Sequence, residues 1–448
     1  MTTTAVPVSV PVAPGRLPVA GHALALQRDP LGFLSSLTPL GGVVKIYLGP
    51  LPVHVLTRPE LVHQMLVTGV ASFEKGRLND KARPFLGNGI MNSGGELHRQ
   101  QRRLMQPAFH RDMISKYVAV MNDKARALAG SWSPGQVVEL QKALDELTLR
   151  IVASTLFTSE LARPAVEEIQ TSLPVVASGA TLRTLSPIGL LTKIPTPGNR
   201  RFTAANAGIR KVIDDVVAAY RAEGTDHGDL LSMVLAARDA DTGRGMSDLQ
   251  VRDELVTLLL TGAETAASAL GSTFHELGRN QDMQARLHTE LQQTLAGRPA
   301  GYDDIPRLEY TQRVLNETLR LHNPAWLLMR RTTSKVTLGD ISLPEGTELL
   351  FCIPTLHRDP VLYPNPSAFD PDRWLQRPVK DLPRGAYLPF GEGSRQCIGN
   401  SYALAEMTVI VAAILSKWRL TPVPGTEPRR LFRAVSRLDR VTMTLTPA

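Results

Sequence analysis

One cysteine near the end of the chain has an unusual setting, the segment FGEGSRQCIG at residues 390–399. The chain has only one other cysteine, Cys352, so a disulfide framework is excluded and a zinc site built from several thiolates is not expected. Arg395 lies two residues before Cys397 and brings a positive charge close to the sulfur. A single thiolate beside an arginine predicts a ligand for a large, flat and partly anionic group, and a haem fits this description.

Several features of this segment favour such a thiolate. A helical pattern begins at residue 401, just after Cys397, and the free N–H groups at a helix start stabilise negative charge. Gly393 and Gly399 allow a tight turn and a close approach of the backbone to a planar ring. Phe390 can shield the sulfur from water, and Arg395 can bind a propionate through two hydrogen bonds. The absence of Cys-x-x-Cys-His excludes a c-type haem, which leaves an inert, buried cysteine as the alternative.

The complete spacing Phe-x-x-Gly-x-Arg-x-Cys-x-Gly argues against an inert cysteine, because so many specified positions in so short a segment give few chance matches. This spacing resembles the cytochrome P-450 superfamily of haem-thiolate monooxygenases. The resemblance implies that Cys397 is the iron ligand of a haem b, and thiolate donation in that class favours cleavage of the O–O bond. It also implies the fold of that family, a triangular bundle that is mainly α with a small β portion, around the haem.

A second motif, LTGAET at residues 260–265, lies within the longest helical pattern of the chain. Taken alone, it is most simply a solvent-facing threonine and glutamate in the middle of a helix. The family has an acid–alcohol pair at this place, and the resemblance implies that Glu264 and Thr265 relay protons to bound dioxygen. Gly262 also matches the family. Thr261 departs from it, because the family usually has alanine or glycine there.

A third motif opens another predicted helix, where His98 and Arg102 are four residues apart and share one face. A solvated basic face is the alternative interpretation. The family commonly has Trp or His followed four residues later by Arg, both in contact with a haem propionate. The resemblance further implies that Arg330 contacts the other propionate, although the neighbouring Arg331 leaves this assignment open by one residue.

A fourth set of residues is expected to support the cysteine loop. Glu317 and Arg320 are three residues apart on a helical pattern, a spacing that alone predicts a surface ion pair. In the family, the arginine of a later segment joins these two residues in a buried network beneath the haem, and Arg373 matches that arginine. We interpret all three residues as structural and not catalytic.

Composition and patterning place these motifs in one globular chain of 448 residues, 43% hydrophobic, with a net charge of +8 and a pI near 9.6. The cations are spread along the chain, so nucleic acid is not expected as a partner. Neither a membrane span nor a signal peptide is predicted, and few cysteines fit the cytoplasm. We expect a proline-rich lead-in at residues 1–18, a single haem-thiolate domain at 19–448, and a monomer. Helical periodicity predicts helices at 96–108, 112–129, 140–155, 200–222, 248–277, 283–295, 310–321 and 401–417, and strands are expected at 43–48, 53–57, 332–338, 348–353 and 441–445.

The substrate prediction rests on positions carried over from the family. The segments expected to line the pocket are largely apolar, which predicts a small lipophilic substrate such as a terpene, and the chain is similar to actinobacterial terpene oxygenases. The residues expected to line the pocket are Phe85, Leu258, Leu259, Thr261, Ala325, Trp326 and Leu327. Simple core packing is the alternative interpretation of these residues.

Electrons are expected from a separate protein, because the sequence holds no flavin or nicotinamide fingerprint. The resemblance implies a ferredoxin with its ferredoxin reductase, and Arg99, Arg103 and Lys417 are expected to form a basic docking face. Two other functions remain open. A peroxide-driven peroxygenase generally lacks the acid–alcohol pair, and a non-catalytic haem sensor does not need one.

Overall fold

The computed structural model describes the chain except for residues 1–8, 158–162 and 186–193. The described residues divide into two compact units, each assembled from segments that are distant in the sequence. The first unit comprises Met1–Lys81, Arg320–Ala368 and Arg373–Cys397. The second comprises Ala82–Leu319, Phe369–Asp372 and Ile398–Ala448. The single domain expected for residues 19–448 stays a prediction.

A five-stranded sheet in the order β1-β2-β8-β5-β3 organises the first unit. The strands predicted at 43–48 and 53–57 are confirmed and form a hairpin, since β1 and β2 pair antiparallel and Gly49 turns the chain with a φ of 64°. β8 then pairs parallel with β2 and antiparallel with β5. The strands of this sheet are β1 (Val43–Leu48), β2 (Leu51–Leu56), β3 (Phe73–Lys75), β5 (Leu327–Thr332) and β8 (Glu348–Cys352).

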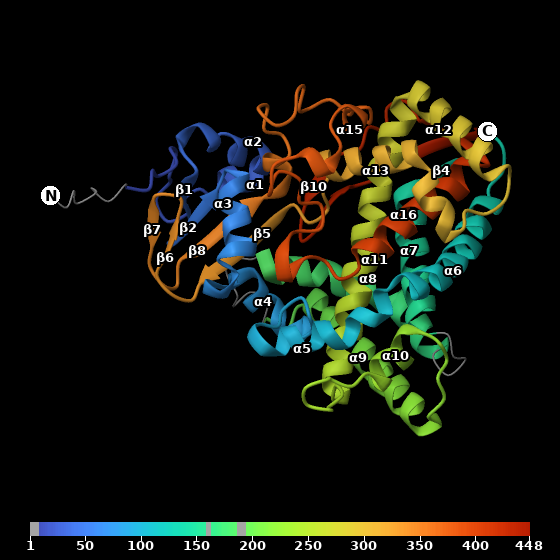
Figure 1. Cartoon of the computed structure of the whole chain (residues 1–448), viewed down its shortest axis with the longest axis horizontal. Helices are drawn as coiled ribbons and strands as arrows, with labels where there is room; N and C mark the ends of the chain where they lie inside the picture. The colour runs from blue at the N-terminus through green and yellow to red at the C-terminus, as the bar shows by residue number, and fades with distance from the viewer. Residues whose placement is uncertain (1–8, 158–162, 186–193) are drawn as a thin grey trace. The chain divides into compact units, whose positions relative to one another are not determined.

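Short helices and a small hairpin complete the first unit. Figure 1 shows α3 lying along the sheet, where Val62 joins a buried cluster with Leu56 and Phe351. The predicted strand at 332–338 is wrong, because β5 ends at Thr332 and a separate strand begins at Val336. The remaining elements are α1 (Ala23–Arg28), α2 (Pro30–Ser35), α3 (Pro59–His63), β6 (Val336–Leu338), β7 (Ile341–Leu343), α14 (Ile353–Leu356) and α15 (Arg373–Gln376), and α4 (Arg77–Leu86) crosses into the second unit.

The second unit is a helical bundle with two small antiparallel sheets. In Figure 1 the long helix α11 runs through the middle of this bundle, between α7, α9 and α16. The helices are α5 (Gly95–Met105), α6 (Arg111–Gly130), α7 (Leu140–Leu156), α8 (Arg163–Leu185), α9 (Pro197–Glu223), α10 (Leu230–Ala236), α11 (Asp248–Arg279), α12 (Gln281–Leu295), α13 (Glu309–Leu321) and α16 (Asn400–Leu415). The strands are β4 (Val137–Glu139), β9 (Trp418–Pro422), β10 (Arg430–Phe432), β11 (Ser436–Leu438) and β12 (Thr442–Pro447).

The helix α11 begins with a capping box, in which Ser247 and Gln250 satisfy each other's backbone N–H groups. Two glycines let α7 approach it closely. A Cβ on Gly262 would stand 3.3 Å from Val152, and a Cβ on Gly271 would overlap with the amide of Gln141. Within the described residues, α11 is the one helix of sufficient length and apolar character to cross a membrane. However, 72% of its most apolar window is buried, as in a core helix.

The loop between residues 359 and 389 is held by hydrogen bonds from its backbone to buried charged side chains. Arg320, which is fully buried, donates hydrogen bonds to the carbonyl oxygens of His357 (2.8 Å), Pro366 (2.8 Å) and Ala368 (3.0 Å). Arg373 donates to the carbonyl oxygens of residues 364 and 365. In the second unit, the buried Glu317 accepts a hydrogen bond from the N–H of residue 370 at 3.0 Å. All three residues therefore bind loop backbone.

Replacing Arg320 with alanine is expected to lower the free energy of unfolding by about 3–5 kcal/mol, because buried carbonyl oxygens lose their charged donor. The matched control is Arg111→Ala, since Arg111 is 72% exposed and pairs with the exposed Asp303. That control is expected to cost at most about 1 kcal/mol. Denaturant titration followed by circular dichroism measures both, and equal losses in the two variants would contradict a structural role for Arg320.

Candidate active site

The cysteine loop of the first unit is a tight turn closed by a backbone hydrogen bond. The N–H of Cys397 donates to the carbonyl oxygen of Phe390 at 2.9 Å. Gly391 and Gly393 adopt φ values of 71° and 72°, a region that favours glycine. A Cβ on Gly393 would also overlap with the carbonyl oxygen of Leu66, so a larger residue would displace the loop. Gly393 is thus required by conformation and by space and Gly391 by conformation alone, whereas Gly399, with a φ of −92°, is under neither constraint.

Side chains from other parts of the first unit brace the same loop. His63 of α3 contacts the carboxylate of Glu392 at 2.9 Å. The side-chain amide of Asn323 donates to the carbonyl oxygen of Pro389 at 3.0 Å. The loop is therefore fixed at both its start and its centre, which holds Cys397 in a defined position.

The two cysteines of the chain differ in what they can bind. Cys352 is buried in β8, and burial raises the pKa of its thiol to about 11. Cys397 is exposed and lies three residues before the start of α16. A thiolate ligand has to be accessible, so Cys397 meets this requirement and Cys352 does not.

Three cations gather near this loop in the first unit. Burial, together with the charge of Arg395, lowers the pKa of Arg330 to about 10. Burial and the charges of Arg330 and Arg395 also hold the pKa of Lys75 well below its usual range. Like charges held together in a poorly hydrated place are stabilised by a bound anion. The cluster therefore fits the carboxylates of a haem beside a thiolate ligand. Lys75 was missed by sequence reasoning, since β3 meets Arg330 only in the folded sheet.

The alternation of side chains along β5 places Arg330 and Arg331 on opposite faces, and the assignment of a propionate to Arg330 stays a prediction. Arg330 is buried near Arg395, as described above. Arg331 lies on the opposite side of the strand and makes ion pairs with Glu74, Asp80 and Glu348. The carboxylates already satisfy Arg331, so the structure favours Arg330 as the residue that is available to an anion.

In the second unit, the LTGAET motif lies in the middle of α11, where one narrow face of a buried helix is partly exposed. Leu258, Thr261 and Thr265 lie on this face, at positions i, i+3 and i+7. The hydroxyl of Thr265 donates to the carbonyl oxygen of Thr261 at 2.6 Å, and the hydroxyl of Thr261 donates to that of residue 257 at 2.7 Å. We call this set the open face of α11.

Glu264 lies beside the open face in a charged environment. Burial raises the pKa of its carboxyl, and Asp145 adds to this, while Arg437 and Arg433 act in the opposite direction. Arg437 donates a hydrogen bond to Asp145 at 2.6 Å, so the two form an ion pair next to Glu264. The carboxyl of Glu264 is therefore held closer to neutrality than an ordinary surface glutamate.

The other predicted site residues are placed as follows. His98 is buried and Arg102 is partly buried on α5 of the second unit, whereas Arg330 and Arg395 belong to the first, so their joint action stays a prediction. Gly399 caps the start of α16. Among the predicted pocket residues, Leu259, Phe85 and Trp326 are buried, and Leu258, Thr261, Ala325 and Leu327 keep exposed surface.

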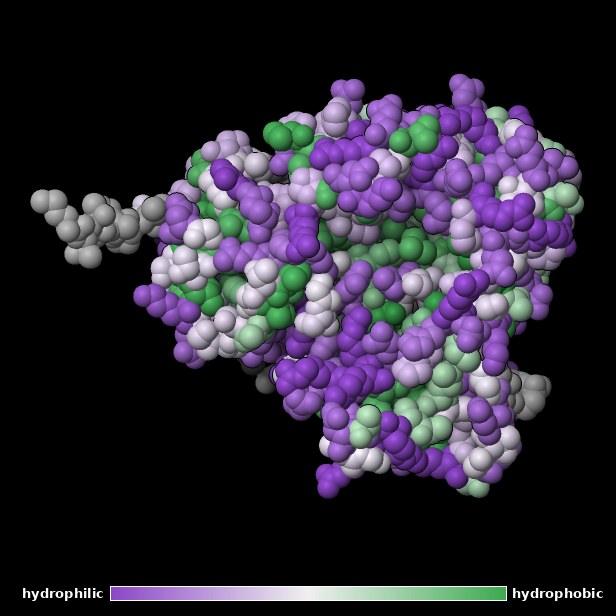
Figure 2. Space-filling view, viewed as in Figure 1, coloured by the Kyte–Doolittle hydropathy of each residue, from purple (hydrophilic) through white to green (hydrophobic). Residues whose placement is uncertain are grey.

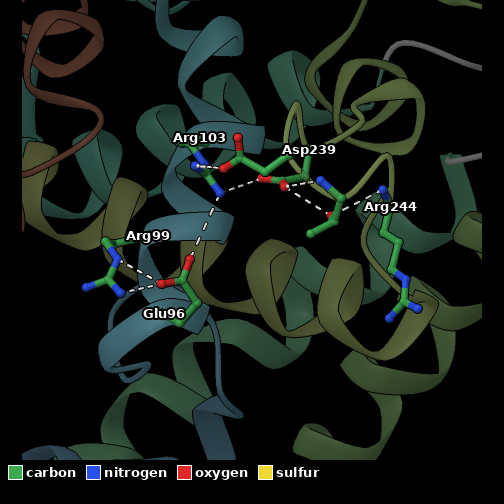
Figure 3. Close-up of polar contacts among 7 residues, drawn as sticks. Glu96, Arg99, Arg103, Asp239 and Arg244 are labelled. Carbon is green, nitrogen blue, oxygen red and sulfur yellow. Dashed lines mark hydrogen bonds and ion pairs between the residues drawn. The ribbon is translucent and has the colours of Figure 1, made fainter.

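The predicted docking arginines are engaged within the protein. Figure 3 shows Arg99 paired with Glu96, and Arg103 paired with the buried carboxylate of Asp239. Arg103 also pairs with Asp241 at 2.6 Å. The face drawn in Figure 2 is strongly hydrophilic over α5, but its arginines are largely neutralised by these carboxylates. Lys417 lies over the ring of Trp418.

Comparison with known proteins identifies the family. A family model described as Cytochrome P-450 matches residues 11–443 of the chain. The chain belongs to the cytochrome P-450 family. Its described fold is similar to the crystal structure of the cytochrome P-450DA haem domain, with a TM-score of 0.88, 24% identity and 99% of each chain covered. The predicted fold, mainly α with a small β portion, is confirmed.

Curated P-450 relatives from Streptomyces are similar over most of the chain. Cyclooctat-9-en-7-ol 5-monooxygenase of Streptomyces melanosporofaciens is 45% identical, covering 92% of this chain and 90% of its own. Cyclooctatin synthase of the same organism is 46% identical, covering 93% and 91%. Pentalenene oxygenase of Streptomyces avermitilis is 38% identical, covering 93% and 92%. The chain is thus a P-450 monooxygenase, an oxidoreductase whose haem b is ligated by a cysteine thiolate.

Replacing Cys397 with serine is expected to abolish the red-shifted Soret band that reduced, thiolate-ligated haem shows under carbon monoxide, because an alcohol is a poor substitute for the thiolate. Cys352→Ser is the matched control and is expected to keep the band, since its thiol is buried and protonated. The carbon monoxide difference spectrum measures both variants. A retained band in Cys397→Ser would refute the ligand assignment.

Proposed function

We propose that this P-450 inserts one oxygen atom of dioxygen into a small cyclic terpene, with electrons from a separate ferredoxin and ferredoxin reductase. The observation that carries the proposal is the 38–46% identity, over more than nine-tenths of the chain, to three oxygenases named for cyclooctat-9-en-7-ol, cyclooctatin and pentalenene. The partly exposed apolar residues Leu258, Ala325 and Leu327 support a lipophilic substrate. A cytoplasmic location and a monomeric state belong to the same proposal.

The haem, when bound, supplies the binding and reductive activation of dioxygen. The protein must hold that group and deliver protons. Cys397 provides the thiolate, and Lys75, Arg330 and Arg395 hold the propionate carboxylates through charge-assisted hydrogen bonds. We assign His98 and Arg102 a part in the same task, as the family resemblance implies.

Glu264 and Thr265 are proposed to deliver protons. The raised pKa of Glu264 suits a carboxyl that both gives and takes a proton. The Thr265 hydroxyl lies on the open face of α11, where it donates to the carbonyl oxygen of Thr261 and keeps its lone pairs as acceptors. The hydroxyl can therefore accept a hydrogen bond from a group that brings a proton and can turn to donate one itself.

Leu258 and Thr261 are proposed to contact the substrate from the same face. Leu258 offers an apolar surface, and Thr261 presents its methyl group because its hydroxyl is occupied by the helix backbone at 2.7 Å. Thr261, where the family usually has alanine or glycine, thus adds bulk to the open face of α11 without adding a polar donor.

A ferredoxin partner is proposed on charge, since a net charge of +8 favours an acidic protein. The ion pairs of Arg99 and Arg103 reduce the charge that the predicted docking face can offer. A partner at this face would have to compete with Glu96, Asp239 and Asp241.

The proposed function is tested by presenting cyclooctat-9-en-7-ol and pentalenene to the holoenzyme and following the haem spin state. Binding of either terpene is expected to shift the Soret band, and dioxygen with ferredoxin and reductase is expected to give a hydroxylated product. Hydrogen peroxide alone is expected to support little turnover. Efficient turnover with peroxide alone would favour a peroxygenase, and binding without turnover in either system would favour a sensor, so either result would overturn the proposal.

Replacing Thr265 with alanine is expected to uncouple the reaction, so that dioxygen is consumed while the yield of product per NADPH falls by roughly tenfold or more. A loss of this size is consistent with the usual contribution of a positioned proton donor. Thr257→Ala is the control, because Thr257 is buried and its hydroxyl bonds the helix backbone. Oxygen uptake, peroxide release and product are measured together. Unchanged coupling in Thr265→Ala would remove this residue from the relay.

A further inference from the structure

Residues 87–92, called the strap below, lie against the first turns of α11 in the second unit. The N–H of Asn88 donates to the carboxylate of Asp253 at 2.7 Å. The N–H of Ile90 donates to the carboxyl of Glu254 at 2.8 Å. Two adjacent acidic side chains of one helix thus bind two alternate amides of the strap.

The strap has the shape that this contact requires. Gly87 has a φ of 74°, and a Cβ on it would overlap with the carboxylate of Asp253. A Cβ on Gly89 would stand 2.6 Å from the carbonyl oxygen of Asp253 and would also overlap with the Thr257 hydroxyl. The backbone of the strap therefore touches α11 directly, and a side chain at either glycine would lift it away.

Neighbouring elements hold the ends of the strap. The side-chain amide of Gln101 on α5 donates to the carbonyl oxygen of Asn88 at 2.9 Å. Arg83 donates to the carbonyl oxygen of Asn92 at 3.2 Å, and Arg210 of α9 donates to that of Phe85 at 3.1 Å. These neutral or cationic donors bind backbone carbonyl oxygens of the strap and of residue 85, while the N–H groups of Asn88 and Ile90 depend on Asp253 and Glu254.

Glu254 lies in line with the open face of α11. Leu258, Thr261 and Thr265 follow it at i+4, i+7 and i+11, positions that return to the same side of an α-helix. Along the axis, Thr265 is about 16 Å from Glu254 at the usual rise per residue. The strap therefore covers the N-terminal end of the face that carries Thr265.

The carboxyl of Glu254 has little solvation. Its side chain is 1% exposed, and its Oε1 atom is buried without a hydrogen-bond partner among the described residues. Burial raises the pKa of Glu254 to about 8, the Ile90 N–H lowers it in part, and the negative charge of Asp253 raises it further. A carboxyl held in this way is neutral at mildly acidic pH and gains its charge within the range in which enzymes work.

We propose that Glu254 is a positioning residue, whose neutral carboxyl holds the strap closed over the end of the open face of α11 and whose ionisation releases it. Residue 254 lies about three helical turns from Thr265, so it acts through the strap. The substrate part of this inference rests on the proposed function, while the release of the strap does not.

The direction of the pH effect follows from linkage. With the strap closed the pKa of Glu254 is about 8, and with the strap open the carboxyl is hydrated and returns toward its ordinary value of 4.5. Opening therefore becomes easier as pH rises between these two values and changes no further above about 8. The charged groups around it are Asp253, Arg252 with its partner Asp214 on α9, Arg210 on α9, and Arg83 on α4. Asp253 is the one whose charge raises the pKa of Glu254.

Hydrogen exchange of the strap in the substrate-free holoenzyme tests the release directly. Exchange is followed by mass spectrometry on peptides that contain Asn88 and Ile90, and each rate is divided by the intrinsic rate at that pH. Between pH 6 and pH 8, protection of the strap in the wild type is expected to fall by on the order of tenfold or more. Glu254→Gln keeps an oxygen acceptor but has no charge to gain, so its protection is expected to stay constant.

A matched control removes an acidic side chain that lies outside the strap contact. Asp248→Asn, at the exposed start of the same helix, is expected to show the same pH-dependent fall as the wild type. Gly89→Ala is expected to lower protection at every pH, because its Cβ displaces the strap. Constant protection in the wild type, or the same fall in Glu254→Gln, would overturn the proposal.

The substrate part is tested by a haem spin-shift titration with cyclooctat-9-en-7-ol. Gly89→Ala is expected to weaken binding severalfold and to raise KM more than it lowers kcat, with the carbon monoxide spectrum unchanged. Equal affinity in Gly89→Ala and the wild type would overturn the substrate role of the strap. If the terpene binds neither protein, the proposed substrate is wrong, while the exchange experiment still decides whether Glu254 controls the strap.

Discussion

The structure depends on one constraint, that a charge taken out of water must find a partner. Arg320 satisfies it with three backbone carbonyl oxygens, and in doing so fixes the loop that leads to Cys397. The buried carboxyl of Glu254 has a single amide N–H as its partner. As a result, it stays neutral to a higher pH than an ordinary glutamate. We propose that the cluster of Lys75, Arg330 and Arg395 finds its partner in the carboxylates of the cofactor.

The same constraint separates structural residues from functional ones. Groups that are held by partners within the protein, such as Arg320 with its carbonyl oxygens and Arg331 with its carboxylates, act as supports. Groups whose surroundings leave a charge uncompensated, or shift a pKa, are candidates for handling a ligand or a proton. Glu264 belongs to the second kind, because burial acts against the charge that Arg437 favours.

Much of this organisation could be predicted from short sequence patterns. The cysteine segment and the strands β1 and β2 are local features, so their residue types and spacing were sufficient, whereas the proton-relay role of Glu264 and Thr265 rests on the family resemblance and stays a prediction. Lys75 and the strap were missed because they depend on contacts between distant segments, such as β3 with β5 and residue 90 with residue 254. The helix α8 was missed as well, since Pro174 interrupts its pattern. Choosing between Arg330 and Arg331 as the propionate-binding residue required the structure of β5, in which the two side chains lie on opposite faces.

The parallel pairing of β2 with β8 has a consequence for how the protein is made. Leu56 lies opposite Phe351, so the central sheet of the first unit joins residues from both ends of the chain. During synthesis at about 5–20 residues per second, β1 and β2 leave the ribosome on the order of tens of seconds before strand β8. For that time the hairpin carries an open, largely apolar edge, so the nascent chain depends on chaperones or on rapid dilution to avoid association through this edge.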